Sequence, residues 1–254
     1  MKHLILAILL LASTALGAKA IELPDEDLNY IVLYKWGLIN KDAASAVLSL
    51  RSDGEHYYAR MAARTLPWAD KVFKVRDTLE STMLRPSCLA EVYNKRTHEG
   101  GRYENDKVIY SRNGDQVTGF VTRLRRKNDG PISRSDTVLH ATGPTVDMLS
   151  VFYYLRMLDF PNMKVGQSVR VNVFSGANVE ELTIVYQGLR TITANKKKWK
   201  TCYLTFNFTQ NGKPISDDMS AWISADERRI PIKLEGKLPL GKVQAYYQSE
   251  SDPK

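Results

Sequence analysis

The segment Cys202-Tyr-Leu-Thr-Phe-Asn-Phe208 sets the fold class, because apolar and polar side chains alternate along it. Successive side chains of a β-strand point to opposite faces of the sheet. The alternation therefore places Leu204, Phe206 and Phe208 on a core and their neighbours toward water. The same period of two recurs at residues 44–50, 168–173 and 230–235. Half-buried strands of this kind are typical of antiparallel sheets.

Further strands are expected between short turn signals. Ser52-Asp-Gly54 and Asn113-Gly-Asp115 are two such signals, and their glycines supply the positive φ that tight hairpins need. Strands joined by such turns are antiparallel, and about ten or more in one sheet curl. We therefore predict an all-β protein with a large curved antiparallel sheet, as a barrel or half-barrel, with a sandwich as the alternative. The additional strands are expected at residues 30–36, 57–63, 89–96, 107–110, 117–125, 182–187 and 243–247.

One mostly apolar helix is predicted near residues 146–158, and Pro161 marks its end. Its strongly polar members are Asp147, Ser150 and Arg156. A helix that is apolar on nearly all sides is buried on nearly all sides. We expect a curved sheet that wraps it or a barrel mouth that it closes, with an ordinary core helix on one sheet face as the alternative. A buried Arg156 requires a carboxylate partner, because an unpaired buried charge is very costly.

The first twenty residues have the order of a secretory signal peptide: a basic start, an aliphatic run at residues 4–11, then small residues. Ala18-Lys-Ala20 predicts cleavage after Ala20, and cleavage after Gly17 is the alternative. The apolar run is shorter than the ~20 residues that a membrane-spanning helix needs. We therefore predict a signal peptide at 1–20 and a single β-rich domain at 21–254, periplasmic or otherwise exported and soluble after cleavage.

Removal of the signal peptide lowers the positive net charge of the chain. Loss of Lys2 and Lys19 with the signal peptide lowers the formal net charge from +8 to +6. Export excludes nucleic acid as an expected partner and leaves an anionic envelope component, such as lipid head groups or acidic glycan. No transmembrane segment is expected in the remaining chain, because its most apolar stretch is too short to cross a bilayer.

Four blocks of the sequence match a known pattern. They are Trp36-Gly-Leu-Ile39, Lys74-Val-Arg-Asp77 with Glu80-Ser81, Asp147 to Arg156, and Asp226 to Gly241. Together they are similar to the bacterial domain-of-unknown-function family 3108, in the family's order, across residues 28–248. The resemblance implies an exported, β-rich bacterial envelope protein, and it implies no catalytic residues. Where the family often has a Pro-Ala-Gly turn, this chain has four residues from Asn195 to Lys198.

Signatures of catalysis and metal binding are missing from the sequence. His56, His98 and His140 are about forty residues apart, and no His-Glu-x-x-His motif occurs. No Gly-x-Ser-x-Gly elbow and no phosphate-binding glycine loop occurs either. We predict no catalytic residue, no metal and no cofactor. A carboxylate-dependent hydrolase stays open as an alternative, since paired acids need only be close in space.

The two cysteines, Cys88 and Cys202, are both expected to point inward. Cys202 shares strand parity with Leu204 and Phe206, and Cys88 shares it with Ala90. Two inward thiols in an oxidising compartment can form a disulfide. Two buried free thiols that act as small apolar groups are the alternative.

The favoured function is binding or carrying an amphipathic or anionic envelope ligand, lipid or glycan, inside the curved sheet. The residues expected to line the ligand site are Trp36, Arg156, Trp199 and Phe206. The alternatives are a structural or interaction module that contacts an envelope protein, and the hydrolase. A void of several hundred cubic ångströms beside the helix would favour ligand binding, and a filled concave face would favour the interaction module.

Overall fold

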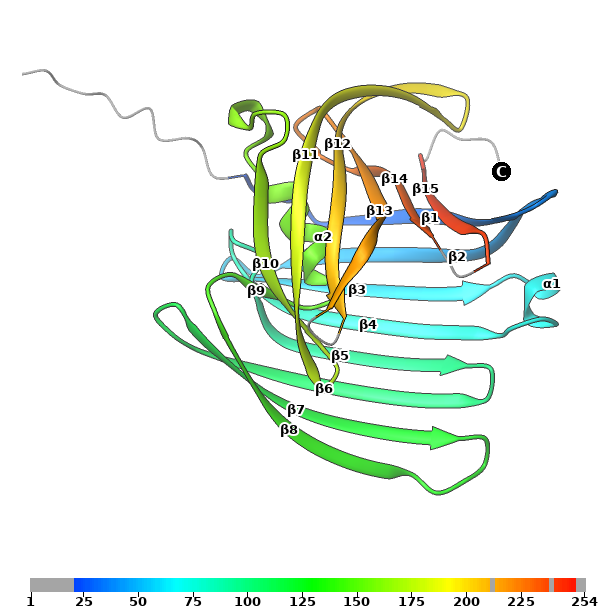
Figure 1. Ribbon diagram of the computed structural model, residues 1–254, viewed down its shortest axis with the longest axis vertical. Helices are drawn as coiled ribbons and strands as arrows, with labels where there is room; N and C mark the ends of the chain where they lie inside the picture. The colour runs from blue at the N-terminus through cyan, green and yellow to red at the C-terminus, as the bar shows by residue number, and fades with distance from the viewer. Residues whose placement is uncertain (1–20, 211–212, 238–239, 250–254) are drawn as a thin grey trace, which may run out of the picture.

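The computed structural model describes residues 21–210, 213–237 and 240–249, which Figure 1 shows as coloured ribbons. The predicted signal peptide, residues 1–20, lies outside the described residues. The N-terminal half of the chain forms one wall of antiparallel strands, each joined to the next by a short connection. Its strands are β1 (Glu26–Trp36), β2 (Ile39–Ser52), β3 (His56–Thr65), β4 (Val75–Leu84), β5 (Ala90–Glu99), β6 (Arg102–Asn113), β7 (Gln116–Lys127) and β8 (Ser133–Thr142).

The C-terminal half forms a second wall, and its strands β10 to β13 run across those of the first wall (Figure 1). β15 pairs with β1, so both walls belong to one 15-stranded sheet with edges at β8 and β9. Neighbouring strands are antiparallel except for β9 and β10. The strands are β9 (Thr145–Val146), β10 (Ser168–Ser175), β11 (Asn178–Ala194), β12 (Lys197–Gln210), β13 (Lys213–Ser224), β14 (Pro231–Lys237) and β15 (Lys242–Gln248).

The sheet curls into a nearly closed barrel, which confirms the predicted all-β class and curved antiparallel sheet (Figure 1). Register shifts interrupt the pairing of β1 with β2, β4 with β5, β11 with β12, β12 with β13, and β13 with β14. A bulge bends its strand and increases the local twist. Shifts distributed over both walls therefore allow a sheet of this size to close on itself.

One aromatic contact brings the two walls together. Phe174 of β10 is fully buried and stacks on Tyr110 of β6, with ring centroids 5.3 Å apart. Gly119 of β7 leaves room for the ring, since a Cβ atom there would lie 2.4 Å from Phe174. A larger residue at this position would force the two walls apart or move the aromatic ring.

The predicted helix is present but shorter than residues 146–158. It consists of α2 (Ser150–Tyr154) and the 3-10 turn η1 (Leu155–Met157), followed by η2 (Phe160–Asn162). Val146 pairs with Val173 in the parallel strands β9 and β10 instead. The Asp147 carboxylate accepts the backbone N–H of Ser150 at 2.7 Å, and the Ser150 hydroxyl accepts the N–H of Asp147 at 2.7 Å. This reciprocal capping box places the helix start after Asp147.

The helical segment lies between the walls and contributes to two apolar clusters. Phe152 and Tyr153 pack in the first cluster with side chains of β1 to β7. Leu155 and Leu158 pack in the second cluster with side chains of β10 to β13. The sheet therefore wraps the helix, which was one of the two arrangements expected for a buried helix. Outside the walls, the four-residue helix α1 (Pro67–Asp70) lies in the connection from β3 to β4.

The strands β4 and β8 were not predicted because their sequences do not alternate cleanly. In β4 the inward positions include Asp77 and Ser81 as well as the apolar Leu79 and Met83. In β8 only Leu139 is buried, because an edge strand faces water on most sides. Hydrophobic periodicity cannot identify strands whose inner face is polar or exposed.

Candidate functional site

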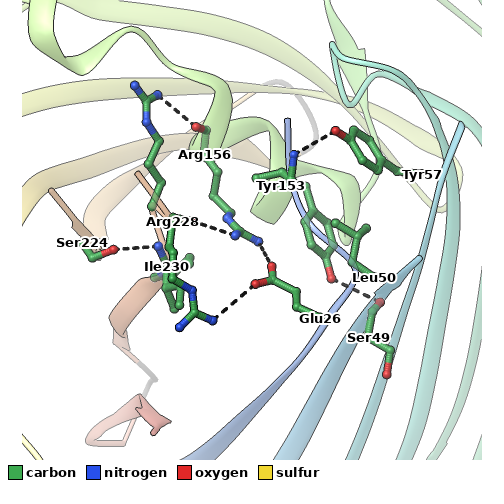
Figure 2. A network of polar contacts seen from close by, with 12 residues as sticks. Glu26, Ser49, Leu50, Tyr57, Tyr153, Arg156, Ser224, Arg228 and Ile230 are labelled. Carbon is green, nitrogen blue, oxygen red and sulfur yellow. Dashed lines mark hydrogen bonds and ion pairs between the residues drawn. The ribbon is translucent and has the colours of Figure 1, made fainter. Parts of the chain in front are cut away.

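An ion pair in the interior joins Arg156 to Glu26 (Figure 2). The Arg156 side chain is 0% exposed, and its Nη1 lies 2.5 Å from Oε1 of Glu26. Its Nη2 donates to the carbonyl oxygen of Arg228 at 2.8 Å. We call Glu26, Arg156 and the segment Arg228-Arg-Ile230 the Arg156 junction. The required carboxylate partner of Arg156 is therefore present, and it comes from the start of β1.

A third charge completes the Arg156 junction from the solvent side. Nη2 of Arg228 lies 3.8 Å from the second carboxylate oxygen of Glu26, and its side chain is 57% exposed. Removing one partner of a buried ion pair leaves an uncompensated charge, which costs about 3–5 kcal/mol. The junction thus holds β1, the helical segment and the connection between β13 and β14 in one arrangement.

Arg229 ties the same connection to the end of the helical segment. Its Nη1 donates to the carbonyl oxygens of Arg156, at 3.1 Å, and of Leu158. The last carbonyls of a helix have no partner within the helix, so these bonds satisfy groups that the fold would otherwise leave open. Burial lowers the pKa of Arg229. Ser224 holds the other side of the connection, because its hydroxyl accepts the N–H of Ile230 at 2.8 Å.

Buried tyrosines around the Arg156 junction act as neutral hydrogen-bonding groups (Figure 2). The hydroxyl of Tyr153 donates to the carbonyl oxygen of Ser49 at 3.4 Å, and the hydroxyl of Tyr57 accepts the N–H of Leu23 at 3.0 Å. Burial raises the pKa of Tyr153. These tyrosines join the N-terminal strands to the helix without adding charge to the interior.

The structure does not bring the four expected ligand-site residues together. Arg156 lies in the buried junction, and Phe206 is 6% exposed inside the second apolar cluster. Trp199 is partly buried against the first cluster, with its ring centroid 6.4 Å from that of Tyr247. Trp36 lies at the end of β1 and is 51% exposed. A site lined by all four residues is therefore not formed in this structure.

Sequence reasoning missed Glu26 as the partner of Arg156. The predicted strand began at residue 30, whereas β1 begins four residues earlier. Glu26 has the same parity as the buried Leu28 and Tyr30, so extending the alternation backward would have placed it inward. Burial of a charge on a strand is a signal for an ion pair, but the sequence does not give the partner's position.

The two cysteines are buried free thiols in the structure, as in the second of the two alternatives. Cys88 lies in the turn before β5 with φ +58° and belongs to the first apolar cluster, whereas Cys202 lies on β12 in the second cluster. The disulfide is therefore not formed here. Burial raises the pKa of Cys88 to about 12, so this thiol is neutral at physiological pH.

Farther along the inner face, β5, β6 and β7 carry charged side chains. Asp106 is 4% exposed and receives Arg125 at 2.5 Å and Arg123 at 3.5 Å. Glu104 lies 3.6 Å from both Lys95 and Arg125. Strand pairing places these five residues on the same face as the buried Val108 and Val121. Three cations face two carboxylates, so the ion pairs neutralise most of the charge on this surface and leave an excess of one positive charge.

One carboxylate pair lies beside this surface, at the ends of β4 and β5. Desolvation and the nearby Glu99 carboxylate raise the pKa of Asp77 to about 7. The two side chains share a hydrogen bond, and the N–H of His98 donates to Asp77 at 3.2 Å. Two carboxylates that share one proton can act as an acid and a base near neutral pH.

Two hollows on the surface are shallow and open to solvent. Two depressions of about 370 and 450 Å³ lie over β2 to β5. Their walls include outward side chains such as Arg51, Arg60 and Glu80 in the first and Arg64 and Arg76 in the second.

Within the described ranges, no cluster of three or more His, Cys, Asp or Glu side chains is arranged to hold a metal ion. None of the helices described is long and apolar enough to span a membrane.

The four blocks that carry the family resemblance meet one another in space. Ser81 of the second block donates its hydroxyl hydrogen to Asp147 of the third at 2.6 Å. Arg156 of the third block contacts Arg228 of the fourth. Gly241, at the end of the fourth block, lies against the first block, because a Cβ atom there would be 2.9 Å from Cβ of Trp36. These contacts link the four blocks to one another.

Comparison with solved structures gives a fold relative. A beta-barrel-like protein of the domain of unknown function DUF1849 from Brucella abortus is similar, with a TM-score of 0.62 and 11% identity. The similarity covers 91% of this chain and 98% of that chain. At this identity it shows a shared fold. A comparison with curated proteins finds no match. The model of the family described as "Protein of unknown function (DUF3108)" matches residues 29–248, so the chain belongs to the DUF3108 family.

Proposed function

We propose that this protein is an exported envelope protein without catalytic activity, whose barrel-like body is a rigid support and whose surface makes the functional contacts. The observation that carries the proposal is the packing of the concave side. The helical segment is buried between the walls, and the charge of Arg156 is used internally by Glu26. The two depressions lie on the outer face of the sheet. This arrangement favours the interaction module over a carrier with a ligand inside.

Export is supported by the order of residues in the segment 1–20. Fractionation of the expressing cell, followed by intact mass measurement, tests it. The expected mass is that of a chain beginning at Ile21, recovered outside the cytoplasm. Recovery of the whole chain from the cytoplasm would contradict export.

Native mass spectrometry tests whether the space between the walls holds a ligand. The protein isolated from its host is expected to have the mass of the bare chain, and solvent extraction is expected to release no stoichiometric lipid or glycan. A small molecule that is recovered in equal amount with the protein, and is lost on unfolding, would restore the carrier hypothesis.

A carboxylate-dependent hydrolase is the second candidate, and the raised pKa of Asp77 beside Glu99 is the observation that favours it. Glycosidase carboxylates are about 5–9.5 Å apart, whereas hydrogen-bonded carboxylates are in direct contact. The pair therefore fits glycoside hydrolysis poorly. Any hydrolysis of envelope glycans or peptides by the purified protein that is lost in Asp77→Asn and kept in Asp53→Asn would favour the enzyme.

A further inference from the structure

Five connections lie at one end of the sheet and form what we call the turn rim. They are the connections from β1 to β2, β3 to β4, β5 to β6, β7 to β8 and β14 to β15 (Figure 1). The turn rim is defined by residues 35–42, 66–74, 99–102, 127–134 and 240–242. The antiparallel order of β1 to β8, together with the pairing of β15 with β1, places all five at the same end.

Contacts between neighbouring turns make the turn rim continuous. The hydroxyl of Tyr34 in β1 donates to the carbonyl oxygen of Leu240 at 2.9 Å. Nε1 of Trp68 donates to the carbonyl oxygen of Asp42 at 2.6 Å, which joins α1 to the start of β2. Next along the rim, the backbone N–H of Gly100 donates to the carbonyl oxygen of Lys74. The backbone N–H of Asn128 donates to the carbonyl oxygen of Gly101. The rim is therefore one surface.

Large apolar side chains project from the turn rim into solvent. Leu38 is fully exposed, Val72 is 80% exposed and Leu240 is 63% exposed. Of the sixteen exposed large apolar side chains in the described part of the chain, seven belong to the rim. Four more complete this set: Trp36, Ile39, Phe73 and Ile132. A concentration of this kind marks an interaction site rather than ordinary surface composition.

The opposite end of the first wall has a different composition. Its connections are residues 53–55, 85–89, 114–115 and 143–144. These turns, all of them described, contain none of the sixteen exposed large apolar side chains. They include the acidic residues Asp53, Glu55 and Asp115. Among the turns of the first wall, exposed large apolar side chains are therefore confined to one end.

Cationic side chains accompany the apolar ones on the turn rim. The rim contains eight cations against four carboxylates. The cations are Lys35, Lys41, Lys71, Lys74, Arg102, Lys127, Arg134 and Lys242, and the carboxylates are Asp42, Asp70, Glu99 and Asp129. The nearby carboxylate of Asp70 is already occupied by Arg76 of β4 at 2.6 Å. Lys41 lies over the Trp68 ring, with Nζ 4.5 Å from the centroid. The rim thus combines projecting apolar tips with a cationic border.

We propose that the turn rim docks this protein onto the surface of an anionic lipid bilayer. Bilayer interfaces accept tryptophan and aliphatic side chains at head-group depth, and anionic head groups attract lysines within a Debye length. The exposed tips come from separate turns, and the cations match a surface of negative charge. This proposal rests on the proposed function, in which the protein acts through contacts at its surface, and it identifies the turn rim as the contact surface.

Vesicle flotation tests the proposal. The purified protein is mixed with vesicles of phosphatidylcholine alone or with about 30% phosphatidylglycerol, and the amount that floats is measured. Binding is expected only with the anionic lipid, and about 0.5 M salt is expected to weaken it at least tenfold. The variant Leu38→Ser/Val72→Ser/Leu240→Ser is expected to bind at least tenfold more weakly. Intact mass confirms that every variant carries the same N-terminus, so that residues 1–20 cannot cause the difference.

A matched variant keeps the test specific. Ile109→Ser/Phe120→Ser/Val138→Ser removes three exposed apolar side chains from β6, β7 and β8, away from the turn rim. This control is expected to bind anionic vesicles as the unmodified protein does. Equal vesicle binding by the rim variant and the control would overturn the proposal. It would also be overturned if the unmodified protein bound no vesicles and instead bound a protein partner that the rim variant fails to bind. Recovery of an internal lipid would instead contradict the proposed function without an internal ligand.

Discussion

The Arg156 junction and the turn rim contain the same kinds of side chain in opposite environments. At the junction, the Arg156 cation is 0% exposed and is neutralised by Glu26, with buried tyrosines around it. At the rim, Trp36 is 51% exposed among lysines that face solvent. Both residues were expected to line one ligand site.

The difference separates stability from recognition. A buried, paired arginine fixes the positions of the elements that it joins, and its charge is no longer available to a partner. An exposed tryptophan beside lysines contributes little to the fold and keeps its apolar surface free for contact. The account therefore assigns stability to the junction and binding to the rim, and variants of either region test this assignment.

The largest effect on stability is expected from Arg156→Met. The substitution leaves Glu26 with a buried charge, so the free energy of unfolding in urea is expected to fall by about 3–5 kcal/mol. Arg170→Met removes an exposed arginine whose Nε lies 3.9 Å from Glu181, and it is the matched control. The control is expected to cost no more than about 1 kcal/mol. Equal losses in the two variants would show that the junction has no special role.

The next largest effect is expected where the walls meet. Gly119→Ala places a Cβ atom against the Phe174 ring, so the free energy of unfolding is expected to fall by about 1–3 kcal/mol. Gly236→Ala is the control, because the nearest atom to its Cβ is 3.8 Å away, and a change within about 0.5 kcal/mol is expected. Phe174→Leu is expected to recover part of the loss in Gly119→Ala. Strict additivity of the two losses would contradict the proposed contact.

A smaller, pH-dependent effect is expected at the carboxylate pair. The pKa of Asp77 is raised from 3.8 to about 7, so the folded state binds more protons than the unfolded state between these values. Stability from this group is therefore complete below about pH 4 and is lost as the pH rises to about 7. Urea titrations of Asp77→Asn are expected to show a gain over the unmodified protein at pH 8 and little difference at pH 4.

Asp53→Asn gives the opposite sign and serves as the control for Asp77→Asn. The Tyr58 hydroxyl and the His56 backbone N–H lower the pKa of Asp53 to about 2. Its contribution is present above about pH 4 and is lost as the pH falls toward 2. Asp53→Asn is therefore expected to destabilise the protein at pH 7. The same pH trend in both variants would contradict the raised pKa of Asp77.

The smallest effect on stability is expected at the turn rim. Leu38→Ser and Leu240→Ser remove side chains that make few buried contacts, so the free energy of unfolding is expected to change by no more than about 0.5 kcal/mol for each. Urea unfolding of the rim variants alongside Arg156→Met gives the comparison directly. A loss at the rim comparable with that of Arg156→Met would mean that the rim is part of the core.

The sequence predicted the fold class because the inner positions of most strands are apolar. Residues 202–208 and 230–235 alternate, and they lie in β12 and around the start of β14. Strand β4 was not predicted, because the polar side chains of Asp77 and Ser81 face inward and interrupt the alternation of apolar and polar residues. The helix start was placed too early, since apolar composition could not distinguish Val146 in a strand from the helix that follows Asp147.

The site residues were harder to predict because distance along the chain does not give distance in space. The need of Arg156 for a carboxylate follows from burial alone, but Glu26 lies 130 residues away in sequence. Trp36 was expected on the interior, whereas it ends β1 and points its ring to solvent at a turn. Strand parity predicts which face of the sheet a side chain occupies. It does not predict whether other parts of the protein cover that side chain.

Hydrogen–deuterium exchange with and without anionic vesicles tests the central claim most directly. If the rim docks on the bilayer, exchange is expected to slow in the turn rim, at residues 35–42, 66–74, 127–134 and 240–242, when vesicles are added. No change is expected in α2 and β1 around the Arg156 junction, whose amides are already protected by burial. Slower exchange confined to the helical segment, or to the turns at residues 53–55 and 114–115, would contradict the division of roles between junction and rim.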